Sequence, residues 1–215
     1  MRRLALFDVD GTLLDSRDMI VACAGGAFAA CGLTPPPSAA ILQNVGLSLP
    51  VFFTRLAGKD APEADLAQAY KTLWRKMRAS PDFAYPLFSG ADALVRALAR
   101  RDDMCLGIAT GKSRGGIDDL IARCDWEGLF STIHTADDAP SKPSPEMIYQ
   151  ALRQTAIAAK DCVMIGDTVF DMEMARAAGA RALGVSWGHH SAAALLDAGA
   201  ELVATDFGEL ARALA

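Results

Sequence analysis

Short apolar runs that end abruptly on polar side chains recur along the chain, a pattern typical of strands buried on both faces of a sheet. The expected strands lie at residues 4–10, 104–110, 131–135, 162–167 and 180–187. Helical patterns separate them, at about residues 90–101, 113–124, 144–155, 169–178 and 191–198. Such alternation is the signature of βαβ units. We therefore expect an α/β fold with a parallel sheet and helices on both faces.

Capping signals support several of the helix boundaries. Ser144 is expected to cap a helix that has Pro145 at its first position. Asp206 and Glu209 form a variant of the capping box. Gly179 follows the pattern at 169–178 and is expected to end that helix.

Residues from about 16 to 80 break the alternation, because they contain helical patterns interrupted by glycine and proline but no convincing buried strand. This segment is expected to be an inserted helical unit at 16–81, and residues 1–15 and 82–215 to form the α/β core. The insertion leaves after the first strand and returns near residues 81–86. It should therefore lie over the carboxyl end of the sheet, where ligands bind in open α/β folds.

Composition narrows the class of protein. The 215 residues carry a formal net charge of -5, and 52% are hydrophobic, so a folded globular chain is expected. There is no dense basic run and no stretch of 18 apolar residues, which argues against a nucleic-acid polymer and a membrane as partners. The apolar start meets Asp8 too soon for a signal-peptide core, so we expect a cytoplasmic protein.

Asp8 and Asp10 form an acidic pair at the end of the first strand. Side chains two residues apart in an extended segment point to the same side. Two negative charges so close together cost free energy unless a cation or a shared proton lies between them. A simple acidic turn is the alternative. An EF-hand is excluded, because its glycine occupies the sixth position and Gly11 is at the fourth.

Asp167 and Asp171 form a second acidic pair, four residues apart at a strand-to-helix junction. Both can face one point if the loop already turns helically, although capping of the helix is the alternative. If both pairs meet at one edge of the sheet, they form a cluster of four carboxylates. Hard oxygen ligands of this kind suit Mg²⁺.

Thr110 and Gly111 follow another strand and open a helix, where a hydroxyl and backbone N–H groups can hold a phosphate. A P-loop would need a glycine at the position of Leu106, so that alternative does not match. Lys142 lies in the loop segment APSKPSPE. Taken alone, it is either a solvated lysine or a functional one.

Together these segments resemble a known family. DVDGTLLDS, ATGKS, SKPSPE and GDTVFDMEMA are similar to the four motifs of the haloacid dehalogenase superfamily of phosphohydrolases, in the same order and across essentially the whole chain. The chain is most similar to the phosphoglycolate phosphatase-like branch, which carries a helical C1-type cap. The resemblance implies a Rossmann-like core and a Mg²⁺-dependent phosphatase that acts on a small phosphorylated metabolite.

The resemblance also implies roles for individual residues. Asp8 would be the nucleophile that forms an aspartyl-phosphate, and Asp10 the general acid and base. The metal would be held by Asp8, the backbone carbonyl of Asp10, Asp167 and Asp171. The phosphoryl oxygens would be bound by Gly11, Thr110, Gly111 and Lys142. Asp10 favours phosphate chemistry over dehalogenation, since a leaving halide needs no proton.

The cap is expected to select the substrate, through a loop that includes Asn44, Gly46 and Leu47. Lys71, Arg75 and Arg78 share one helical face and are interpreted as a solvated stripe, and Trp74 and the pair Phe52–Phe53 as packing within the cap. A metal role for His189 and His190 is not expected.

2-Phosphoglycolate is the first expected substrate, and pyrophosphate, a sugar phosphate and a nucleotide monophosphate are the others considered. A phosphosugar mutase and a non-enzymatic phosphate-binding module stay open as alternatives. Either a monomer or a homodimer is compatible with the sequence.

Overall fold

One parallel sheet organises the protein. The computed structural model describes residues 2–80 and 86–215. Its strands are β1 (Arg3–Phe7), β2 (Met104–Ala109), β3 (Thr132–His134), β4 (Cys162–Gly166), β5 (Arg181–Val185) and β6 (Leu202–Ala204). They pair in parallel in the order β3-β2-β1-β4-β5-β6. The strand order therefore reverses between β1 and β4, which is the point where open α/β sheets bind ligands.

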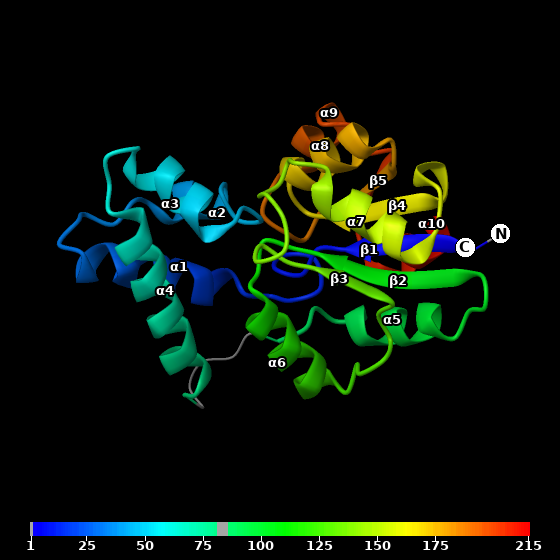
Figure 1. The fold of residues 1–215 in the computed structure, drawn as a ribbon, viewed down its shortest axis with the longest axis horizontal. Coiled ribbons are helices and arrows are strands. Elements are labelled where there is room, and N and C mark those ends of the chain that lie inside the picture. The colour runs from blue at the N-terminus through cyan, green and yellow to red at the C-terminus, as the bar shows by residue number, and fades with distance from the viewer. Residues whose placement is uncertain (1, 81–85) are drawn as a thin grey trace.

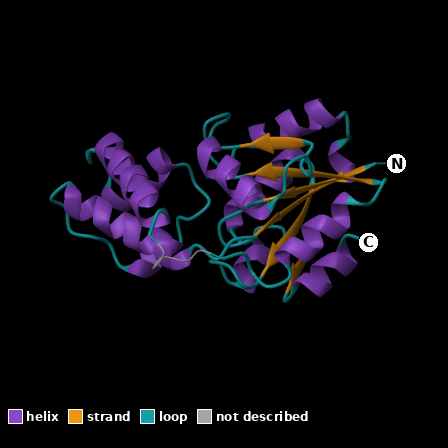
Figure 2. Ribbon diagram, turned by 90° about the horizontal axis from the view of Figure 1, so that it is seen from below, coloured by secondary structure: helices purple, strands orange, loops and turns teal. Residues whose placement is uncertain are grey.

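Helices cover both faces of the sheet (Figure 2). They are α5 (Ala91–Ala99), α6 (Arg114–Cys124), α7 (Glu146–Thr155), α8 (Val169–Ala178), α9 (Ala192–Asp197) and α10 (Phe207–Ala213), with a short 3₁₀ turn at Ala159–Asp161. Alternate residues of β1 enter two separate cores, because neighbouring side chains on a strand point to opposite faces. Leu4 and Leu6 pack with α7, α8 and α9, whereas Ala5 and Phe7 pack with α5, α6 and α10. The expected α/β fold is confirmed.

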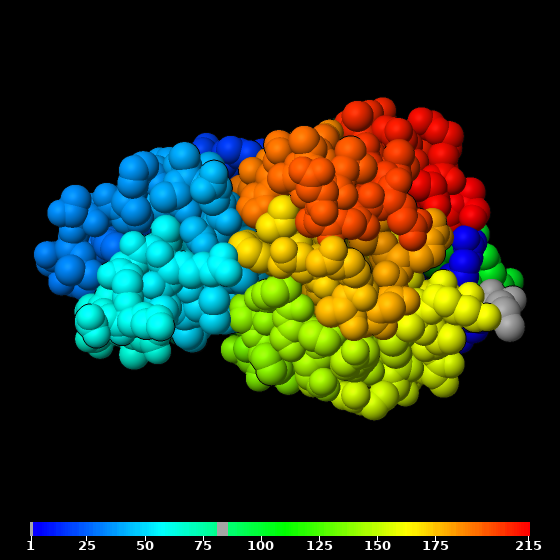
Figure 3. Space-filling view, turned by 90° about the horizontal axis from the view of Figure 1, so that it is seen from above, coloured from blue at the N-terminus to red at the C-terminus, as the bar shows by residue number. Residues whose placement is uncertain are grey.

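A helical segment forms a separate lobe (Figures 1 and 3), and the carboxyl ends of the strands point toward it (Figure 2). Its helices are α1 (Arg17–Ala30), α2 (Ser38–Leu42), α3 (Leu49–Ala57) and α4 (Glu63–Arg78). Phe28, Phe53 and Leu66 belong to a core that these helices share, and Phe170 of α8 joins the same cluster. Most of the expected return of the chain near residues 81–86, and with it the boundary at 81/82, lies outside the described residues.

The sequence missed β6 and placed some boundaries slightly differently. The strand β6 has only three residues between polar neighbours, too few for an apolar run to be recognised. The helix α7 begins at Glu146, with Pro145 rather than Ser144 at the N-cap. Gly179 ends α8 in the left-handed conformation, and Asp206 caps α10 by accepting from the Glu209 N–H, as expected.

Candidate active site

Three buried carboxylates meet where the strand order reverses. Asp8 directly follows β1, Asp167 follows the neighbouring strand β4, and Asp171 lies in the first turn of α8. One carboxylate oxygen from each lies within 4.8 Å of the others, and all three side chains are buried. An arrangement of three hard oxygen donors can hold a metal ion.

Asp8 is the least satisfied member of this cluster. Lys142 Nζ lies 2.9 Å from its Oδ1 as an ion pair, but within the described part of the chain neither carboxylate oxygen has a partner in hydrogen-bond geometry. The pKa of Asp8 is raised to about 7. Burial is the largest cause, Lys142 acts in the opposite direction, and the charges of Asp171 and Asp167 contribute to the rise. A cation beside Asp8 would relieve this cost.

Lys142 reaches the cluster from the loop before α7, and its side chain is 1% exposed. Its Nζ donates to Asp171 Oδ1 at 2.6 Å, in addition to its ion pair with Asp8. Burial disfavours the ammonium, but the two carboxylates outweigh it and raise the pKa of Lys142 above its ordinary value. The alternative of a solvated lysine is therefore wrong.

Asp167 is held by donors on both oxygens. Thr12 Oγ1 donates to Oδ1 at 2.9 Å, and the backbone N–H of His189 donates to Oδ2 at 2.9 Å, with the His189 ring Nδ1 at 2.6 Å from the same oxygen. Burial raises the pKa of Asp167, but the contacts with His189 and Thr12 prevail and lower it. Only glycine fits at position 11, beside Asp167 and His189, because a Cβ there would lie 2.3 Å from Asp167 Oδ2. The φ of Gly11 is also +86°, a conformation that other residues rarely adopt.

Asp171 serves a second purpose in the helix α8. Its Oδ2 accepts hydrogen bonds from the N–H and the hydroxyl of Thr168, at 3.1 and 2.7 Å. A capping box is present at this helix start. Both interpretations of the segment GDTVFDMEMA therefore coexist, since the other oxygen of Asp171 meets Lys142 within the carboxylate cluster.

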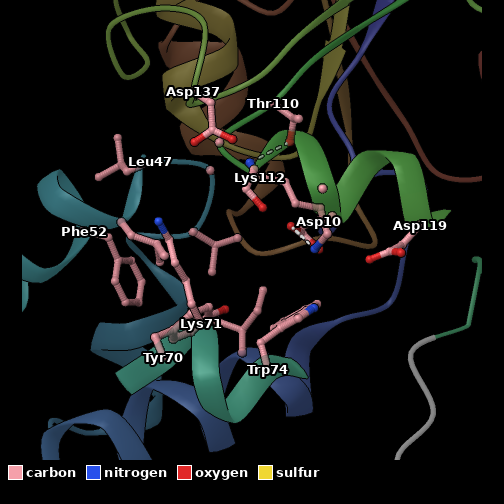
Figure 4. Close-up of a pocket in the computed structure, with 18 of the residues that line it drawn as sticks. Asp10, Leu47, Phe52, Tyr70, Lys71, Trp74, Thr110, Lys112, Asp119 and Asp137 are labelled. Carbon is pink, nitrogen blue, oxygen red and sulfur yellow. Dashed lines mark hydrogen bonds and ion pairs between the residues drawn. The ribbon is translucent and has the colours of Figure 1, made fainter. Parts of the chain in front are cut away.

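Asp10 stands apart from the cluster, so the structure gathers three carboxylates where four were expected. The strand β1 ends at Phe7, and Asp10 is held instead by Lys112 Nζ at 2.9 and 3.0 Å and by Ser16 Oγ at 2.7 Å. Lys112 Nζ also lies 4.1 Å from the centroid of the Trp74 ring of α4 (Figure 4). One lysine thus connects Asp10 to the helical lobe.

The loop 43–48 of the helical lobe lies against the loop after β2. A Cβ at Gly111 would come within 2.4 Å of the carbonyl oxygen of Gly46, so only glycine allows this approach. The N–H of Ser48 donates to Ser141 Oγ at 2.9 Å, next to Lys142.

A cavity of about 570 Å³ lies between the lobe and the sheet. Asp8, Asp10, Thr110 and Gly111 line it together with Gly46 and Leu47. Asn44 does not line it, and its side-chain amide donates to the Ala40 carbonyl instead.

The stripe of basic residues on α4 also reaches this cavity. Lys71, Arg75 and Arg78 all line it, with Lys71 and Arg75 exposed and Arg78 paired with Asp119 of α6. Trp74 lines the cavity too, so its interpretation as packing within the lobe is incomplete.

Sequence reasoning did not assign Thr12, Ser16, Lys112 or His189 to the site. The first two are hydroxyl residues in the segment DVDGTLLDS, and Lys112 directly follows Gly111. For His189 the sequence left the role open apart from not expecting a metal ligand, and in the structure its ring contacts Asp167. His190 accepts from the Val169 N–H at Nδ1, and its Nε2 lies 3.1 Å from the Gln43 carbonyl oxygen, which links α8 to the helical lobe.

A Rossmann-like sheet with a buried acidic cluster at its switch point defines the general class, an α/β protein with a site suited to a cation and an anion. The sequence pattern of the haloacid dehalogenase-like hydrolase family matches residues 5–185. The chain belongs to this family and is an enzyme of the hydrolase class. None of the helices in the described part of the chain combines the length and apolar character needed to span a membrane.

Individual relatives are similar over nearly their whole length. A probable phosphatase IndB of Dickeya dadantii is 28% identical over 98% of this chain and 92% of its own. A phosphoglycolate phosphatase of Cereibacter sphaeroides is 32% identical over 82% of this chain and 81% of its own. The structure of a haloacid dehalogenase-like family hydrolase from Streptococcus pneumoniae superposes with a TM-score of 0.84 at 26% identity, covering 100% of this chain and 99% of that one.

Proposed function

We propose that this enzyme is a Mg²⁺-dependent phosphatase that hydrolyses a small phosphate monoester through an aspartyl-phosphate on Asp8. The observation that carries the proposal is the buried Asp8 carboxylate, which borders the cavity and lies beside two further acids. It forms an ion pair with Lys142 but has no partner in hydrogen-bond geometry in the described structure. Such a carboxylate can attack phosphorus as a nucleophile once a cation offsets the charge between it and the phosphate. The names of the relatives support the reaction class.

The acidic cluster fits a divalent cation. Asp8, Asp167 and Asp171 would hold Mg²⁺ with the backbone carbonyl of Asp10, and the raised pKa of Asp8 is the mark of a carboxylate that needs a positive neighbour. When bound, the ion would neutralise charge between the carboxylate and the phosphate dianion.

The chain's own residues carry both chemical steps. An oxygen of Asp8 forms a bond to phosphorus as the ester P–O bond breaks, and Asp10 gives a proton to the departing alcohol. Asp10 then takes a proton from water, which attacks phosphorus and releases Asp8 and inorganic phosphate. Ser16 and Lys112 orient Asp10 for both transfers.

Lys142, Thr110 and the backbone near Gly11 and Gly111 would bind the equatorial phosphoryl oxygens. Lys142 is suited to this, because its buried ammonium already lies 2.9 Å from Asp8 Oδ1. We assign residues 1–15 and 82–215 to the catalytic core and 16–81 to a cap that closes the cavity and contributes Gly46 and Leu47 to its wall.

Two substrates are the first candidates. 2-Phosphoglycolate follows from the resemblance and from the name of one relative, and a nucleoside monophosphate is an alternative with a much larger leaving group. The two differ in how much of the cavity the leaving group would fill.

The test is phosphate release from a panel of monoesters, pyrophosphate and phosphonoacetaldehyde, with Mg²⁺ and with EDTA. We expect metal-dependent release from monoesters, a loss of at least about a thousandfold in kcat for Asp8→Asn, and a phosphorylated Asp8 in acid-quenched protein by mass spectrometry. The exposed Asp197→Asn is the matched control. Unchanged turnover in Asp8→Asn would refute the mechanism, and binding of phosphate without any turnover would favour a binding module.

A further inference from the structure

The cavity has two chemically different ends. Asp8, Asp10 and Thr110 form the polar end at the sheet. Across from it, apolar side chains of α3 and α4 form a second end, which the basic side chains of α4 border (Figure 4). Its volume of about 570 Å³ lies in the range of pockets that hold drug-sized ligands, of about 300–1,000 Å³. A two-carbon acid would leave much of this space to water.

Aromatic rings dominate the apolar end. Tyr70 and Trp74, one helical turn apart on α4, stack at a centroid distance of 5.9 Å and an interplanar angle of 21°. Phe52 of α3 meets Tyr70 edge-on at 6.4 Å. The aliphatic residues that complete this end are Ile20, Val45, Leu47 and Leu49. We call the set formed by Phe52, Tyr70 and Trp74 the aromatic wall.

The aromatic wall begins where the leaving group departs. Asp10 protonates the departing alcohol in the proposed mechanism, and Lys112 bridges Asp10 to the face of Trp74. The alcohol therefore emerges beside Trp74 rather than into open solvent.

Charge at this end does not favour a carboxylate. Lys112 is already paired with Asp10, and Arg78 with Asp119. Lys71 and Arg75 are exposed on α4, while Asp118, Asp119 and Asp137 bring acidic groups to the same lining. An uncharged flat ring matches this environment better than the carboxylate of 2-phosphoglycolate does.

We propose that the preferred substrate is a phosphate monoester whose alcohol carries a flat unsaturated ring, which packs edge-on against the aromatic wall, because Lys112 already lies over the Trp74 ring and Tyr70 stacks on it. This inference rests on the proposed phosphatase function and specifies its substrate class. Edge-on contacts between aromatic rings do not require one particular ring, so any flat ring at the right distance from phosphorus is a candidate, including a nucleobase.

The experiment compares monoesters of primary alcohols that differ in the ring: benzyl phosphate, cyclohexylmethyl phosphate, propyl phosphate and 2-phosphoglycolate, each with Mg²⁺. We expect kcat/KM for benzyl phosphate to exceed that for propyl phosphate by about 10- to 100-fold, mostly through KM. Cyclohexylmethyl phosphate should fall between them, because it shares the apolar area but not the flat face.

Variants of Trp74 test the wall directly. Trp74→Ala should lower the ratio of benzyl to propyl kcat/KM about tenfold, Trp74→Phe should keep most of it, and the exposed Val51→Ala on α3 should leave the ratio unchanged. If Trp74→Ala lowered kcat/KM equally for benzyl phosphate and propyl phosphate, the proposal would be overturned, since Trp74 would then act through Lys112. If the wild type had a higher kcat/KM for 2-phosphoglycolate or propyl phosphate than for benzyl phosphate, the proposal would also be overturned.

A binding arm separates this inference from the proposed function. Benzylphosphonate and propylphosphonate, which lack the scissile ester oxygen, are titrated by calorimetry into the wild type and Trp74→Ala. Tighter binding of benzylphosphonate that Trp74→Ala abolishes would support the wall even if no monoester is hydrolysed, in which case the phosphatase proposal alone fails. Equal affinities would refute the wall even if hydrolysis occurs.

Discussion

Asp8→Asn is expected to stabilise the metal-free protein at neutral pH while it removes turnover. Asp8 lies in a buried cluster with Asp167 and Asp171, and its ion pair with Lys142 does not compensate for the burial. Asparagine keeps the shape of the side chain but cannot ionise. The substitution therefore removes a charge that the folded protein holds at a cost.

The size of this effect follows from the pKa of Asp8, which rises from 3.8 to about 7 on folding. Each pKa unit corresponds to about 1.4 kcal/mol, so ionised Asp8 destabilises the metal-free fold by about 4 kcal/mol. Because the pKa of Asp8 is higher in the folded protein, the folded state still holds a proton at pH values where the unfolded state has lost it. The free energy of unfolding therefore falls as pH rises from about 4 to about 7, and about 3 kcal/mol of this loss lies between pH 5 and pH 8.

The assay is urea unfolding in EDTA at several pH values, for the wild type, Asp8→Asn and the exposed control Asp197→Asn. We expect the stability difference between Asp8→Asn and the wild type to widen by about 3 kcal/mol from pH 5 to pH 8, and the control to follow the wild type. Saturating Mg²⁺ should stabilise the wild type more than Asp8→Asn. A constant difference across pH, or an Asp8→Asn protein less stable than the wild type at pH 8, would refute the reasoning.

Two further substitutions probe the partners of the acidic cluster. His189→Leu should weaken Mg²⁺ binding by about 10- to 100-fold, because Asp167 loses its closest side-chain donor; calorimetric titration measures this, and an unchanged affinity would contradict it. Lys142→Met should destabilise the metal-free protein by about 3–5 kcal/mol in urea unfolding, since it leaves Asp8 without its cation. Lys160 is exposed, so Lys160→Met is the control for Lys142→Met. Equal stability of the two variants would show that the buried ammonium of Lys142 does not stabilise the metal-free protein.

The sheet could be predicted from the sequence because each long strand is a continuous apolar run that ends on a polar residue. Asp8 and Asp167 could be assigned to one edge for the same reason, since the carboxyl ends of parallel strands coincide. The three residues of β6 carry too little pattern to be recognised, and they form a strand because β5 offers them a partner.

The burial of Lys142 could not be predicted, because its neighbours in the loop are polar and prolines. Asp8 and Asp171, 134 and 29 residues away along the chain, provide the charges that keep it buried. The separation of Asp10 from the cluster was also hidden, because it depends on where β1 ends. Such contacts form between residues far apart in the chain, so the sequence around each residue does not indicate them.

In the proposed mechanism, Lys112 makes substrate choice and chemistry physically dependent on each other. Its ammonium binds both oxygens of Asp10 and lies over Trp74, so a ring that displaces or tilts Trp74 also changes the position of the proposed acid and base. Substitution of Trp74 should therefore alter kcat as well as KM.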